Sequence, residues 1–125
     1  MPEMLFDVMW PDDSLDRCYS PSTVIQKHVR TDTSYALEEL LENLRAGLTE
    51  AGERISQRFG HYCSGARDQL ARLEAKSARF APQEQVRILG LYRRGGARPL
   101  EAVLADEQQR RQSLLDGADL PIAAE

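Results

Sequence analysis

Two cysteines and the residues beside them are the side chains of this sequence most suited to carrying out chemistry. Cys18 precedes Tyr19 and Ser20, and Cys63 precedes Ser64, so each thiol comes shortly before a residue that can begin a helix. The free backbone N–H groups at a helix start bind anions and favour the thiolate form of a nearby cysteine. If both helix starts faced one cleft, they would suit a small anion or a nitrile-like group. The simpler interpretation, which we favour, is two buried thiols beside ordinary helix caps.

The same region contains residue types that bind metals. His61 and Cys63 are two residues apart, and zinc would accept both together with Cys18. No fourth ligand is evident, so we predict no metal site and no cofactor. A glycine-rich phosphate loop, a nucleophile elbow and a paired zinc motif are also missing from the sequence, and catalytic residues stay unknown. The candidate binding or reactive surface consists of Trp10, Cys18, Tyr19, Ser20, Cys63 and Ser64.

Composition narrows the classes of function. The chain has 125 residues, of which 42% are hydrophobic and 29% charged, as expected for one globular domain. Its net charge of -4 argues against binding to nucleic acid or to an anionic membrane surface. No apolar run approaches the ~20 residues of a membrane-spanning helix, and the first residues do not form a secretory signal. We therefore expect a cytoplasmic protein with no nucleic-acid or membrane partner.

Hydrophobic periodicity predicts a β-hairpin at the start of the chain. Residues 4–10 alternate with a period of two, which indicates a strand with one strongly buried face. A polar turn and a second alternating run at 15–19 complete the hairpin. Ser20 and Pro21 then predict the start of a short helix over about 21–29.

Two longer helices and a third strand follow. A continuous apolar stripe predicts a helix over 37–59, with Thr33 or Ser34 as its cap and Gly60 at its end. A second helix over 64–80 lies antiparallel to the first, because the link between them is short. In the predicted third strand, one face has Val86, Ile88 and Tyr92, and the other has Leu89 and Leu91.

These elements predict an α+β fold. The N-terminal β-hairpin and the later strand form a small sheet, which the antiparallel helical hairpin covers. Residues 1–93 make up the domain, and 94–125 form an extension with a loosely attached C-terminal helix and a frayed end. Because both faces of the strands carry apolar residues, the second face needs a cover. The C-terminal helix or another subunit could supply it, so we expect a homodimer.

Several short runs resemble a small bacterial family of nitrogen-starvation response proteins. The opening run is Met1-Pro2-Glu3-Met4-x-Phe6-x-Val8-x-Trp10-Pro11-Asp12. Further runs are Cys18 to Ser22, Ser34-Tyr35, Cys63-Ser64, Gln69 to Ala71 and Glu74-Ala75. The resemblance covers about residues 1–93. The chain departs from the family pattern at Asp13, where glycine is expected, at Ala36, where proline is common, and at His61, where an apolar residue is expected.

The resemblance implies a metabolic context. Such proteins are encoded in a nitrilase gene cluster with a radical-SAM protein, an acetyltransferase, an AIR-synthase-like protein and a flavoprotein. The cluster is associated with nitrogen starvation and with the use of cyanide or nitriles as a nitrogen source. We therefore expect an accessory or interaction protein whose partner is the nitrilase, flavoprotein, radical-SAM protein or acetyltransferase. The alternative is a small thiol-dependent enzyme or carrier that uses Cys18 or Cys63 on a nitrile-derived metabolite. A regulator acting through protein partners is a third hypothesis.

Overall fold

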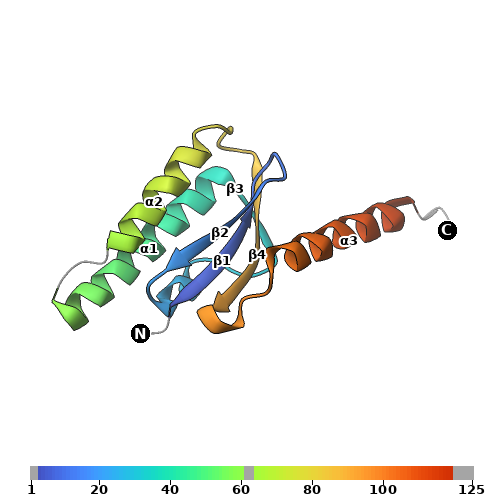
Figure 1. The fold of residues 1–125 in the computed structure, drawn as a ribbon. Coiled ribbons are helices and arrows are strands. Elements are labelled where there is room, and N and C mark those ends of the chain that lie inside the picture. Colours follow the sequence, from blue (N-terminus) through green and yellow to red (C-terminus); the bar gives the residue numbers. More distant parts are fainter. Residues whose placement is uncertain (1–2, 61–63, 120–125) are drawn as a thin grey trace.

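The computed structural model describes residues 3–60 and 64–119, with side chains through residue 116. Figure 1 shows a sheet with two helices on one side and a third helix extending from the other side. The elements are β1 (Met4–Met9), β2 (Leu15–Ser20), η1 (Thr23–Lys27), β3 (Thr33–Ala36), α1 (Leu37–Phe59), α2 (Ser64–Ser77), β4 (Gln85–Arg93), η2 (Arg94–Gly96) and α3 (Leu100–Asp119). The predicted α+β class is confirmed, as are the β-hairpin, the helical hairpin and the C-terminal helix.

The sheet contains one strand more than the sequence predicts. Its order is β2-β1-β4-β3, and each neighbouring pair is antiparallel. The additional strand is β3, which pairs Thr33 with Ile88 and Ala36 with Gln85. The sequence analysis assigned Thr33 and Ser34 to a helix cap instead. That assignment is wrong, because four residues without alternation give no strand signal of their own.

A β-bulge at the centre of the sheet decides which residues of β4 face the helices. Asp7 pairs with Gly90 and Val8 pairs with Ile88, so Leu89 is the extra residue. The bulge reverses the alternation, and Leu91 therefore packs against the helices' side of the core. Tyr92 lies on the opposite face, where it lines a hollow with Leu89. The predicted faces of Leu91 and Tyr92 were consequently wrong.

The main core lies between the sheet and the helices α1 and α2. Phe6, Val8 and Ile88 on the sheet are fully buried, as are Leu44 and Leu48 on α1. The apolar stripe of α1 thus supplies the packing that the sequence predicts for it. Figure 1 shows α1 and α2 side by side over the sheet, which agrees with the predicted helical hairpin.

The first turn of α1 is capped by backbone from a distant segment. Its N-cap residue is Ala36, whose side chain offers no cap hydrogen bond. Instead Leu37 N–H donates to the carbonyl of Glu84 at 2.8 Å, and Glu38 N–H donates to the carbonyl of Pro82 at 2.9 Å. These carbonyls satisfy N–H groups that would otherwise lack a partner inside the helix. The predicted cap by Thr33 or Ser34 was wrong because those residues belong to β3.

The short helix after the hairpin is a single 3₁₀ element. It begins at Thr23 rather than near Pro21, and its cap is Ser22, whose hydroxyl accepts from Val24 N–H at 3.2 Å. Its two buried residues are Val24 and Ile25. A Cβ at Gly47 of α1 would lie 2.6 Å from Ile25 Cδ1, so glycine allows the short helix to approach α1 closely.

Gly60 ends α1 as the sequence predicts. Its φ is 81°, in the left-handed region, and its N–H donates to the carbonyl of Ser56 at 2.8 Å. Among the described residues other than its chain neighbours, no atom lies within 4 Å of the position that a Cβ would occupy there, so backbone conformation is the reason for glycine.

We expect Gly60→Ala to lower the free energy of unfolding by about 1 kcal/mol, because an L side chain is strained at this φ. Urea denaturation would measure the change. Gly95→Ala is the matched control, since its Cβ also meets open space and its φ is outside the left-handed region. An equal loss in both variants would contradict the backbone explanation.

Candidate functional site

Trp10 joins the first strand to the second helix. Its indole Nε1 donates to Asp16 Oδ2 at 2.8 Å, and its ring stacks on Phe80 with centroids 5.9 Å apart. The ammonium of Lys76 lies 5.6 Å from the indole centroid and 3.4 Å from Asp16 Oδ2. The residue is therefore a core anchor whose polar edge reaches a charged rim.

Cys18 lies in the core between β2 and α2. Only 2% of its surface is exposed, and burial raises the pKa of its thiol, with Asp16 and Asp7 adding to the effect. A thiol in this environment stays protonated and reacts slowly. The position of Cys18 therefore matches a structural thiol more closely than a nucleophile.

Tyr19 and Ser20 have local structural contacts. The backbone N–H of Tyr19 donates to Gln69 Oε1 at 2.9 Å, and its hydroxyl donates to Glu3 Oε2 at 2.9 Å. Ser20 is fully buried, and its hydroxyl donates to the carbonyl of Ser22 at 2.9 Å. The structure thus ties Tyr19 to α2, while Ser20 stabilises the turn into η1.

The other half of the predicted surface is only partly described. Cys63 and His61 lie outside the described residues, and Ser64 is an exposed first residue of α2. Within 3–60 and 64–119, no group of three or more histidine, cysteine, aspartate or glutamate side chains could hold a metal ion. Over the same residues, no helix has both the length and the apolar character needed to cross a membrane.

A hollow of about 180 Å³ brings two of the predicted residues together. It lies between β2 and α2, and its lining residues are Trp10, Asp16, Arg17, Cys18, Gln69, Arg72, Leu73 and Lys76. Sequence reasoning found Trp10 and Cys18 but missed the two cations on α2. Arg72 and Lys76 are four residues apart, which places them on one helical face, and this spacing was the available signal.

A second polar cluster, on the opposite face of the sheet, was also missed. Asp7 is fully buried, and Arg17 binds it through two bonds, Nε to Oδ1 at 2.8 Å and Nη2 to Oδ2 at 2.9 Å. Tyr92 forms a hydrogen bond to Asp7, and its ring centroid lies 5.3 Å from the Arg17 guanidinium carbon. Burial raises the pKa of the Tyr92 phenol and Asp7 adds to this, so the phenol stays protonated. The signal was an aspartate among apolar strand residues.

Charged side chains also attach α3 to this second face. Glu107 is 4% exposed and binds Arg110 at 2.7 Å and Arg111 at 3.2 Å, while Arg87 Nε of β4 lies 3.5 Å from it. The hydrogen bond from Arg110 is the main reason that the pKa of Glu107 is lowered, against the effect of its burial. Arg111 also binds Asp13 at 2.8 Å in the turn of the β-hairpin.

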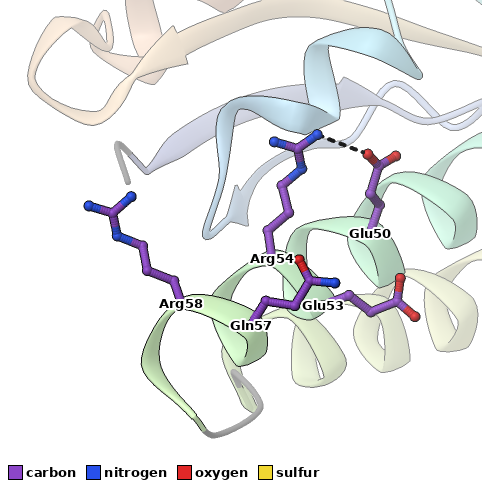
Figure 2. Close-up of a pocket in the computed structure, with 5 residues that line it drawn as sticks. All are labelled: Glu50, Glu53, Arg54, Gln57 and Arg58. Carbon is purple, nitrogen blue, oxygen red and sulfur yellow. Dashed lines mark hydrogen bonds and ion pairs between the residues drawn. The ribbon is translucent and has the colours of Figure 1, made fainter.

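Another hollow lies along α1 and is a poor candidate for a site. Figure 2 shows its five lining residues, Glu50, Glu53, Arg54, Gln57 and Arg58, all of which come from this one helix. Glu50 binds His28 at 2.9 Å and Arg54 at 3.5 Å, so its carboxylate is already engaged. Side chains from one exposed helical face do not enclose a ligand.

One known family matches more than half of the chain. Residues 5–91 match the model of the family described as nitrogen starvation-induced protein NitG. The chain belongs to this family. Neither a curated protein nor a solved structure matches the chain.

The NitG match includes the hollow between β2 and α2 but not helix α3. The matched range contains the hollow between β2 and α2 and the Asp7–Arg17 pair, and it ends one residue before Tyr92. Helix α3 begins at Leu100 and lies beyond the matched residues, although Glu107 and Arg111 bind side chains within them.

We expect Asp7→Asn to lower the free energy of unfolding by about 3 kcal/mol, because it leaves the Arg17 charge largely buried without its carboxylate. Chemical denaturation would measure the loss. Asp68→Asn is the control, since Asp68 is an exposed acid on α2 and its substitution should change stability by less than about 0.5 kcal/mol. Similar values for the two variants would show that the buried pair contributes little.

The thiol of Cys18 should resist alkylation in the folded protein. In a Cys63→Ser variant, we expect iodoacetamide to label Cys18 at least about tenfold more slowly than free cysteine, because its raised pKa and burial both reduce attack. Mass spectrometry would follow the rate, and denaturant should restore it. Labelling of the native variant at the rate of free cysteine would contradict this assignment.

Proposed function

We propose that the protein is an accessory protein of the nitrogen-starvation response that binds a protein partner and catalyses no reaction itself. Membership in the NitG family supports the context. The contacts of three carboxylates support the lack of catalysis: Asp7, Glu50 and Glu107 each form an ion pair with an arginine. Cys18, the predicted nucleophile within the described residues, is buried with a raised pKa.

The end of α3 is the observation that carries the interaction role. Val103 and Glu107 pack against the sheet. Leu114 lies eleven residues after Val103 and seven after Glu107, which places it on the same helical face. The side chains of residues 112–116 are exposed, and Leu114 and Leu115 are 59% and 60% exposed. Figure 1 shows this part of α3 projecting away from the body of the protein. Adjacent exposed leucines on a projecting helix are typical of a partner-binding surface.

The partner we propose is a cytoplasmic enzyme encoded in the same gene cluster, namely the nitrilase, flavoprotein, radical-SAM protein or acetyltransferase. The sequence resemblance described above is the support for this choice. A second copy of the chain is the alternative occupant, which would give the homodimer expected from strands that are apolar on both faces. Because α3 lies outside the family match, contact through it would be a property of this chain.

The thiol-dependent enzyme or carrier is the second candidate function. Its support now rests on Cys63, since Cys18 lies in the core. Turnover of a nitrile or a derived metabolite by the purified protein, lost in Cys63→Ser, would favour this candidate over the accessory role.

Co-expression with each cluster enzyme tests the accessory role. We expect the tagged wild-type protein to retain one of them in stoichiometric amounts and the Leu114→Asp/Leu115→Asp variant to lose it, because charges replace the exposed apolar surface. The control is Gln112→Asp/Ser113→Asp, which adds the same charges to the same exposed turn. Equal retention by both variants would contradict docking through the leucines. A dimer in light scattering that only the leucine variant disrupts would identify a second copy as the occupant.

A further inference from the structure

The hollow between β2 and α2 combines an apolar floor with a cationic rim. Trp10, Cys18 and Leu73 are buried residues that supply apolar surface. The rim contains Arg72 and Lys76 of α2. Its volume of about 180 Å³ is small, which suits a metabolite of a few carbon atoms.

The positive charges at this rim are incompletely neutralised. Arg72 and Lys76 are separated by one helical turn, where two like charges repel each other. Asp16 accepts from Trp10 at 2.8 Å and lies 3.4 Å from Lys76, so this one carboxylate is shared. Among the described residues, no carboxylate lies within ion-pair distance of Arg72. Its side-chain hydrogen bond goes to the amide oxygen of Gln69 at 3.4 Å.

Gln69 is itself held in place by the sheet. Its Oε1 accepts from the backbone N–H of Tyr19 at 2.9 Å, and the residue is buried. Gln69 therefore fixes the wall of the hollow against the edge strand β2 and directs Arg72 along it. Lys76 is similarly restricted, with a side chain that is 19% exposed and an ammonium over the Trp10 ring. The hollow thus has one lysine held over Trp10 and one exposed arginine beside a buried glutamine, and cations beside apolar surface can bind an oxyanion.

We propose that this hollow binds a small organic anion, with its carboxylate or phosphate held between Arg72 and Lys76 and the rest of the molecule inside the hollow, close enough to Trp10 to change the environment of its ring. An arginine can bind such a group through two parallel N–H···O bonds, and the anion removes the repulsion between the cations. The site lies within the family-matched residues and is separate from the leucines of α3. It is independent of the proposed protein partner.

Trp10 provides a built-in probe because it is the chain's single tryptophan. Titrations with succinate, L-glutamate and inorganic phosphate at constant ionic strength should show a saturable change in its fluorescence for at least one of them. Thermal unfolding provides a second readout, since a ligand that binds the native state raises Tm. Succinate or glutamate as the active probe would identify a carboxylate ligand, and phosphate would identify a phosphate ligand.

The variant Arg72→Gln should weaken binding by about tenfold or more, because it removes the charged fork while leaving the fold intact. The control is Arg79→Gln, an exposed arginine after α2 that does not line the hollow. Equal binding by wild type and Arg72→Gln would overturn the proposal. So would the absence of a saturable response in both readouts at up to ~10 mM of each probe, which covers dissociation constants near ~1 mM. Retention of a cluster enzyme is measured separately, so one proposal can fail without the other.

Discussion

The two central strands, β1 and β4, pair through a β-bulge, in which Leu89 of β4 is an extra residue opposite Asp7 and Val8. This bulge places Ile88 and Leu91 toward the helices although their spacing is odd. It also turns Tyr92 to the other face, where the ring lies over Gly90 and the phenol reaches Asp7. A side chain at position 90 would meet that ring, with a Cβ 2.6 Å from Tyr92 Cζ. Both faces of the sheet thus depend on this single irregularity.

The two faces are stabilised by different forces. Apolar packing holds α1 and α2, whereas α3 is attached through Glu107, Arg111 and their partners on the sheet and the hairpin turn. The lowered pKa of Glu107 means that this contribution is present above the carboxyl's unfolded pKa and is lost as the pH falls through its folded value. Acid and salt should therefore release α3 before they affect the main core.

Periodicity was sufficient to predict the elements that bury a long stripe or alternate regularly, namely β1, β2, β4, α1 and α2. It could not predict β3, whose four residues become a strand only through pairing with β4. It also could not predict the bulge, because the extra residue is defined by the partner strand. Trp10 and Cys18 were found because their residue types draw attention. The spacing of Arg72 and Lys76 shows that they share a helical face, but only the tertiary packing places them beside Trp10.

The position of β4 also determines when the sheet can form during synthesis. Although β4 is the last strand in the sequence, it lies between β1 and β3 in the sheet. A nascent chain that ends before Gln85 can form the β1–β2 hairpin, but β3 has no neighbour and the inner edge of β1 is open. Such open edges can pair with other chains. The ribosome must therefore release the chain through Arg93 before all four strands can pair, and until then the inner edge of β1 is exposed to other chains.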